Sequence, residues 1–148
     1  MKKLISIIGT TGIGKTKLAI EIAKHFETEI ISCDSRQFFA EMKIGTATPS
    51  EDELAAVPHH FIGHLSVENY YSIGQFEKEA LQKIEDLFQK HEVVIMVGGS
   101  MMYEKAVLEG LNDLPEADEK NQKELERIFA EEGIENLQKI LQVLDPDY

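Results

Sequence analysis

The sequence predicts an α/β protein in which helices flank a parallel sheet. Three apolar segments of strand length, residues 4–8, 29–34 and 92–99, alternate with segments that have helical spacing. Each strand is followed by residues able to do chemistry: the glycine loop "GTTGIGKT", the carboxylate Asp34, and a glycine pair with Ser100. Because ligands of open α/β sheets bind at the carboxyl ends of the strands, we expect one site where these three segments meet.

The first strand leads through the glycine loop into a helix predicted over residues 15–26. Leu18, Ile22 and Phe26 recur at helical spacing, so we expect them to form its buried face. The short apolar run before the glycines is followed by no cleavage site for a signal peptide. No stretch approaches the roughly 20 apolar residues of a membrane span.

Residues 35–72 break the pattern with glycines, prolines and three histidines, which indicates a long loop region with short helical pieces. We expect the histidine-containing part to pack over the substrate pocket. Residues 73–91 restore helical spacing and lead into the most apolar strand, after which a helix is predicted over residues 101–111. The apolar face of the longer helix is predicted to consist of Phe76, Ala80, Ile84, Leu87 and Phe88.

Beyond Pro115, two charged helices are predicted over residues 116–133 and 134–145, joined at Gly133. Three parallel strands are few for a sheet with helices on both faces. We therefore expect the chain to be truncated, with residues 1–111 forming an incomplete P-loop α/β core.

Composition limits the classes of function. The chain has 148 residues, one cysteine (Cys33) and a net charge of −12. A single cysteine excludes an internal disulfide framework and favours a reducing, cytoplasmic compartment. The acidic balance argues against a protein that grips nucleic acid with its whole surface.

The glycine loop matches G-x-x-x-x-G-K-[ST] and lies between a strand and a helix, as phosphate binding requires. Its N–H groups and the positive end of the helix would surround a phosphate, Lys15 would add a charge, and the Thr16 hydroxyl can ligate Mg²⁺. The motif alone leaves open a nucleotide kinase, a GTPase switch and a transferase that uses a pyrophosphate ester. The predicted phosphate-binding residues are Gly9, Thr10, Thr11, Gly12, Ile13, Gly14, Lys15 and Thr16.

Five further segments follow the loop in order: "ISCDSRQFF", "IGTAT", "VPHHFIG", "YSIGQFEKEA" and "VGGSMMYEKAVLEGL". With the loop, they closely resemble the tRNA dimethylallyltransferases, the IPP transferase family, over the whole chain. By this pattern the chain is similar to the N-terminal half of such an enzyme. The resemblance implies that residues 112–148 begin a helical insertion that binds tRNA.

The resemblance also implies that the loop holds the diphosphate of dimethylallyl diphosphate, while an adenosine beside the anticodon of tRNA supplies the attacking N6 amine. Asp34 is the candidate base, because a carboxylate at the sheet edge can accept the amine proton. Ser100, where the family usually has Thr, can hydrogen-bond the amine or the bridging oxygen. The implied tRNA contacts are Asp34, Ser35, Arg36, Gln37, Ser100 and Gln122, the last at a position where the family tends to have Arg.

We expect a cytoplasmic monomer that uses Mg²⁺ and does not bind membranes. Three alternatives stay open: a small P-loop kinase that phosphorylates a metabolite, an isopentenyltransferase acting on free adenine nucleotides, and a nucleotide-binding module without catalytic activity. The kinase is the weaker reading, since a phosphoryl-transfer lid needs arginines and only Arg36 and Arg127 are present.

Overall fold

A parallel sheet with strand order β1-β4-β2-β3 lies at the centre of the first part of the chain. The structure is a computed structural model that describes residues 1–111 and 118–147. Met1–Leu111 and Asn112–Tyr148 form separate units. The strands are β1 (Lys3–Ile8), β2 (Ile30–Ser32), β3 (His59–His60) and β4 (Val93–Gly98).

The register of the strands brings their carboxyl ends together. Ile8 of β1 lies opposite Gly98 of β4, and Ser32 of β2 lies opposite Val97. The segments that follow β1, β2 and β4 therefore begin at the same edge of the sheet. The parallel α/β fold predicted from the sequence is confirmed.

One strand was not predicted. β3 consists of His59 and His60 alone and pairs with β2, within the region expected to be loop and short helices. Two residues are too few to show the alternating pattern that marks a strand. The short helical piece expected nearby is present as α2 (Glu51–Ala56), whose N-terminus has a capping box between Ser50 and Glu53.

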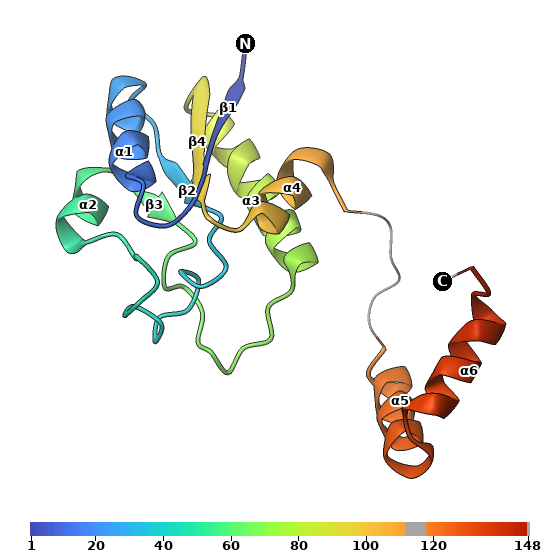
Figure 1. Cartoon of the computed structure of the whole chain (residues 1–148). Helices are drawn as coiled ribbons and strands as arrows, with labels where there is room; N and C mark the ends of the chain where they lie inside the picture. Colours follow the sequence, from blue (N-terminus) through green and yellow to red (C-terminus); the bar gives the residue numbers. More distant parts are fainter. Residues whose placement is uncertain (112–117, 148) are drawn as a thin grey trace. The chain divides into compact units, whose positions relative to one another are not determined.

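Helices cover both faces of the sheet (Figure 1). Helix α1 (Lys15–His25) packs on one face, and α3 (Ile73–Phe88) and α4 (Met101–Glu109) pack on the other. The predicted buried face of α3 is confirmed for four of its five residues, while Phe88 is half-buried.

The predicted face of α1 is wrong for two of its three residues, because Ile22 is half-buried and packs against the core while Leu18 and Phe26 are exposed. Leu18 and Phe26 are 48% and 45% exposed, and the residues buried against the sheet are Ala19, Ile20 and Ala23. The two alanines allow the helix backbone to lie close to the sheet, so that the longer apolar side chains project from its flank.

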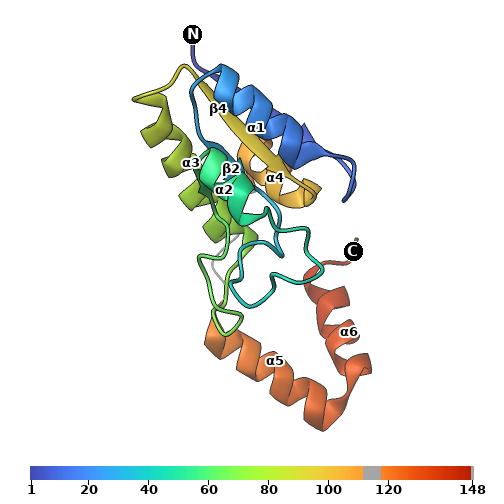
Figure 2. The same ribbon diagram turned by 90° about the vertical axis from the view of Figure 1, so that its left-hand side faces the viewer.

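Two segments extend from the carboxyl end of the sheet, the β2–α2 connection and the β3–α3 connection, and they run side by side in both views (Figures 1 and 2). A bridge between Phe39 and Leu65 joins them, and the N–H of Gly63 donates to the carbonyl of Gln37 at 2.8 Å. The residues after β2 are thus held by a second segment of the chain.

The second unit is described over residues 118–147 and contains α5 (Glu119–Glu132) and α6 (Ile134–Leu144). They meet at Gly133, whose φ of 78° lies in the region that favours glycine. Residues 116 and 117, predicted to begin the first of these helices, lie outside the described residues. In the described parts of the chain, no helix is both long and apolar enough to span a membrane.

A carboxylate between two imidazoles ties three segments together at the amino end of the sheet. Glu29 lies 2.6 Å from Nε2 of His60 and 3.7 Å from Nε2 of His91. Burial alone would raise the pKa of Glu29, but the hydrogen bond and charge of His60, with those of His91, outweigh it and hold that pKa below its usual value.

We predict that Gly98→Ala destabilises the protein. A Cβ on Gly98 would lie 2.6 Å from Sγ of Cys33 and 2.7 Å from its carbonyl carbon. Relief would require β2 to move, so we expect a loss of about 2 kcal/mol or more in the free energy of unfolding, measured by chemical denaturation. Gly74→Ala is the matched control, because its Cβ would meet Leu111 at an ordinary 3.8 Å inside a helix. Equal stability of the two variants would contradict the described packing of β2 and β4.

We also predict a pH-dependent effect of Glu29→Gln. Because the pKa of Glu29 is lowered in the folded state, its carboxylate contributes stability above the unfolded value of 4.5, and the contribution is lost as the pH falls through the folded pKa. At pH 6 the free energy of unfolding of the variant should be about 1 kcal/mol lower than that of the wild type. Near pH 3 the two values should approach each other. Thermal unfolding across this range tests the prediction, and a constant difference at every pH would refute it.

Candidate functional site

The phosphate loop runs from the end of β1 to the start of α1. Gly12 and Gly14 adopt φ angles of 83° and 95°, which glycine allows without strain. No side chain caps the N-terminus of α1, so its first N–H groups stay available for an anion. Lys15 folds back over the loop, where Nζ donates to the carbonyl of Thr10 at 2.8 Å.

Gly99 shows how closely the segments after the three strands approach. A Cβ built on Gly99 would lie 3.3 Å from Oδ2 of Asp34 and 3.9 Å from the carbonyl oxygen of Gly9. The start of the phosphate loop, the predicted base and the end of β4 therefore meet around one glycine. The structure brings together residues that lie about 25 and 65 positions apart along the chain.

Asp34 is half-buried directly after β2. Its Oδ1 accepts the N–H of Arg36 at 3.1 Å, and its backbone carbonyl accepts the N–H of Gln37 at 3.0 Å. The carboxylate thus shapes a turn through one oxygen, while the other oxygen faces Gly99. A turn residue and a proton acceptor are compatible roles, because they use different oxygens.

Ser100 is half-buried and lies across the edge from Ser35. Its Oγ accepts the N–H of Ser35 at 3.0 Å and is 3.1 Å from the Ser35 hydroxyl. It occupies the N-cap position of α4, yet its side chain forms no cap hydrogen bond. The hydroxyl therefore belongs to the sheet edge rather than to its own helix.

The amide of Gln37 forms three hydrogen bonds within the protein. Its Oε1 accepts the hydroxyl of Ser32 at 3.1 Å, and its Nε2 donates to the carbonyls of Thr46 and Ala47 at 3.2 and 3.0 Å. In this arrangement Gln37 holds the loop around residue 46 against the sheet edge. An adenine would have to displace these bonds to be read by this amide.

Arg36 is exposed within the turn from Asp34 to Gln37. Gln122 lies on α5 in the second unit, where its Nε2 donates to Glu126 at 3.1 Å. The structure thus brings five of the six residues predicted to contact tRNA to the sheet edge or its first turn, and Gln122 belongs to the separately described unit.

An aromatic cluster supports the turn, and sequence reasoning did not identify it. Phe38 is fully buried and stacks on Phe76 with ring centroids 5.0 Å apart. Tyr71, Tyr103 and His64 pack edge-on against Phe38 at 5.4–5.7 Å. The apolar pair directly after "DSRQ" was the available signal for this anchor.

The expectation for the histidines needs correction. His59 and His60 form β3, and His64 belongs to the aromatic cluster, where burial lowers the pKa of its imidazole. These histidines serve the sheet and the cluster beneath the turn instead of forming one cover. Within residues 1–111 and 118–147, no group of three or more His, Cys, Asp or Glu side chains is arranged to hold a metal ion.

Beneath the edge lies a thiol that is held neutral. Burial, with the nearby charges of Glu104 and Asp34, raises the pKa of Cys33 to about 12. Glu104 itself accepts the hydroxyl of Ser6 at 2.6 Å, which joins α4 to the middle of β1. The hydrogen bond between Ser6 and Glu104 was not predicted from the sequence.

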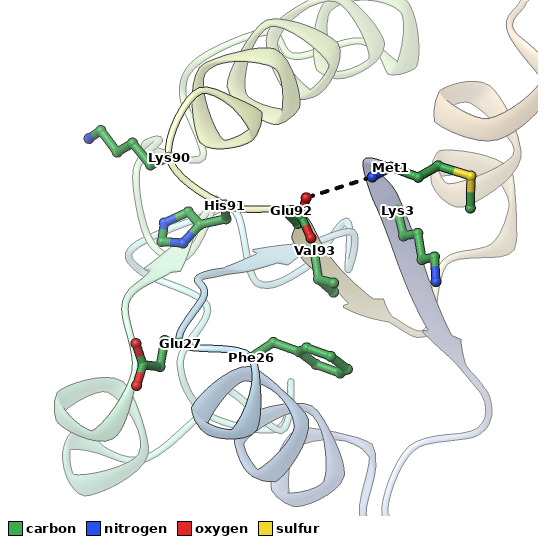
Figure 3. Close-up of a pocket in the computed structure, with 8 residues that line it drawn as sticks. All are labelled: Met1, Lys3, Phe26, Glu27, Lys90, His91, Glu92 and Val93. Atoms are coloured by element: carbon green, nitrogen blue, oxygen red, sulfur yellow. Dashed lines mark ion pairs between the residues drawn. The ribbon is translucent and has the colours of Figure 1, made fainter.

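A cavity of about 410 Å³ lies at the opposite end of the sheet and contains none of the predicted site residues (Figure 3). It is bordered by the amino ends of β1 and β4, where the N-terminal amine lies 3.6 Å from Glu92. Its eight lining residues are Met1, Lys3, Phe26, Glu27, Lys90, His91, Glu92 and Val93. The chemistry-bearing residues therefore gather on the open edge, away from this cavity.

Comparison with known proteins gives a consistent result. The family model described as "IPP transferase" matches residues 37–148. The chain is 59% identical over 145 residues to a tRNA dimethylallyltransferase of Christiangramia forsetii and 51% identical over 148 residues to one of Flavobacterium johnsoniae. These alignments cover 98% and 100% of this chain and 48% of each relative. The chain spans about half the length of the curated relatives it matches.

Solved structures agree. The tRNA isopentenylpyrophosphate transferase of Bacillus halodurans matches with a TM-score of 0.73 and 34% identity, over 99% of this chain and 49% of that one. A eukaryotic dimethylallyltransferase acting on tRNA matches with a TM-score of 0.81 and 30% identity, over 99% of this chain and 37% of that one. The match to the family model, together with the meeting of phosphate loop, Asp34 and Ser100 at one sheet edge, shows that the chain belongs to the IPP transferase family.

Proposed function

We propose that the protein containing this chain transfers a dimethylallyl group from dimethylallyl diphosphate to N6 of the adenosine next to the anticodon in tRNA. The observation that carries the proposal is the arrangement around Gly99, where the phosphate loop and the Asp34 carboxylate approach the same point. A diphosphate bound in the loop would present its ester carbon toward that carboxylate. The names of the relatives point to the same reaction.

The chemical step needs little from the protein beyond placement and charge. The N6 nitrogen forms a bond to the allylic carbon, the bond from that carbon to the bridging oxygen breaks, and diphosphate leaves. Asp34 takes the proton that the amine loses. The loop N–H groups, the N-terminus of α1 and Lys15 stabilise the negative charge that develops on the leaving group.

Mg²⁺ is the cofactor we propose, and the residues present fit it in part. Thr16 lies in the first turn of α1 and can offer its hydroxyl, while the phosphate oxygens would supply further ligands. The ion would add positive charge against the diphosphate.

We propose that tRNA approaches over the turn that contains Ser35, Arg36 and Gln37. The adenine must leave its stack so that its N6 amine can reach the allylic carbon of a diphosphate held in the phosphate loop. Arg36 is exposed and positive at this point. We further propose that Gln122 contacts the RNA, that residues 112–148 begin a tRNA-binding insertion, and that the protein acts as a cytoplasmic monomer.

A metabolite kinase is the second candidate, favoured by the loop and by a carboxylate at a strand end. Against a kinase stands the shortage of arginines, which a phosphoryl-transfer lid would need. Arg127 is engaged by Glu124 and Glu131 on its own helix, which leaves Arg36. An enzyme acting on free adenine nucleotides would have the same residues at the sheet edge and would differ in needing no tRNA.

We predict that the full-length protein with Mg²⁺ binds dimethylallyl diphosphate more tightly than ATP, as measured by titration calorimetry. Lys15→Ala should weaken binding of the allylic diphosphate by about tenfold or more, because a charge-assisted hydrogen bond is lost. Lys17→Ala is the matched control, since Lys17 lies on the same helix but lines the groove toward α2. A clear preference for ATP would replace the proposed reaction with the kinase.

We predict that Asp34→Asn strongly slows transfer while preserving the turn. The amide oxygen can still accept the N–H of Arg36, but the side chain can no longer take a proton. Single-turnover transfer of a labelled prenyl group to tRNA should slow by roughly 10²- to 10⁴-fold. Affinity for dimethylallyl diphosphate should change by less than about threefold. Transfer by the variant at the wild-type rate would exclude Asp34 as the base. If the wild-type protein transferred the prenyl group to free AMP but not to tRNA, it would be the enzyme that acts on free adenine nucleotides.

A further inference from the structure

The hydroxyl of Ser100 is turned away from the helix that it begins. A serine at an N-cap position ordinarily accepts an N–H from the first turn of its helix, and Ser100 accepts none. The helix start depends on its backbone carbonyl, which accepts the N–H groups of Tyr103 and Glu104 at 3.0 and 3.2 Å. A favourable local hydrogen bond is therefore forgone in exchange for a contact with Ser35.

The contact with Ser35 involves two groups that use the Ser100 oxygen. A hydroxyl has one proton to donate and two lone pairs that accept. The N–H of Ser35, 3.0 Å away, can only donate, so it occupies one lone pair. The Ser35 hydroxyl, 3.1 Å away, occupies the second lone pair when it donates. The proton of Ser100 is then left to point toward a bound substrate.

We propose that Ser35 is a positioning residue that holds the Ser100 hydroxyl as a hydrogen-bond donor to the leaving diphosphate. This inference rests on the proposed prenyl transfer. In it, the bridging oxygen gains negative charge as its bond to the allylic carbon breaks, and a donor aimed at that oxygen stabilises the transition state more than the bound substrate.

Ser35 is well held for this task. It lies in the turn closed by the hydrogen bond from the Gln37 N–H to the Asp34 carbonyl. Phe38, one residue beyond, is fully buried in the aromatic cluster. Ser100, in contrast, lacks the β-methyl that restricts the χ1 angle of threonine. The contact with Ser35 can thus fix the orientation of the Ser100 hydroxyl, which the Ser100 side chain alone does not fix.

The test is a set of double variants in the full-length protein. Ser35→Ala removes the hydroxyl and keeps the backbone N–H, so we expect kcat for prenyl transfer to fall by about five- to tenfold. The dissociation constant for dimethylallyl diphosphate and the KM for tRNA should stay within about twofold, because the contact acts in the transition state. Ser35→Thr, which retains a hydroxyl, should keep most of the activity.

The same Ser35→Ala change is then made in two further backgrounds. With Ser100→Ala it should have no additional effect on kcat, because the group that it orients is gone. With Ser100→Thr its effect should shrink to less than about twofold, because the β-methyl now restricts the rotamer. Thermal unfolding of each variant verifies that the fold is retained.

An equal loss caused by Ser35→Ala in all three backgrounds would overturn the inference, as would an unchanged kcat. A loss confined to the KM for tRNA would also overturn it and assign Ser35 to RNA contact alone. If the wild-type protein transfers no prenyl group to tRNA, the proposed function fails and the inference fails with it. If the wild-type protein is active and the Ser35 and Ser100 substitutions lower kcat independently of each other, the inference is wrong and the proposed function still holds.

Discussion

The site depends on the contact between the ends of β2 and β4. Gly98 lies against the backbone and Sγ of Cys33 so closely that no Cβ fits between them. This approach places Gly99 between Asp34 and Gly9, and it places Ser100 within hydrogen-bond distance of Ser35. Because β4 lies between β1 and β2 in the sheet, the segment after β4 necessarily enters between the phosphate loop and the carboxylate. The strand order and the absence of a side chain at Gly98 together bring the phosphate loop, Asp34 and Ser100 to one place.

Short polar side chains then connect the segments that the sheet brings together. Three hydroxyls and one amide at the edge pair with one another or with a neighbouring loop: Ser32 donates to Gln37, Gln37 donates to the loop around residue 46, and Ser35 contacts Ser100. Such bonds contribute little to stability individually, since each replaces a bond to water. Their effect is to fix rotamers next to a site where geometry governs rate. The aromatic cluster beneath the turn contributes the stability that they do not.

The sequence allowed the strands and the edge to be predicted, because a buried parallel strand has an unmistakable apolar run and its carboxyl end has a fixed place in the fold. It did not allow β3 to be predicted, since His59 and His60 carry no periodic signal. It misled on α1, where large apolar residues were weighted above Ala19 and Ala23, which are fully buried against the sheet. Asp34 could be chosen from sequence because one strand end suffices to place it. The pairing of Ser100 with Ser35 depends on two segments 65 residues apart, which no local pattern encodes.

The acidic balance of the chain does not conflict with a site for anions. Charges separated by more than about 8 Å are largely screened at physiological ionic strength, so a net charge of −12 describes the surface as a whole and not the field at one edge. At the phosphate loop the nearby groups are N–H donors, the N-terminus of α1 and the ammonium of Lys15, which donates to the carbonyl of Thr10. A diphosphate can replace that carbonyl as the acceptor. The same local argument applies to the RNA path that we propose over Arg36: the charges close to that path, and not the net charge of the chain, would govern binding there.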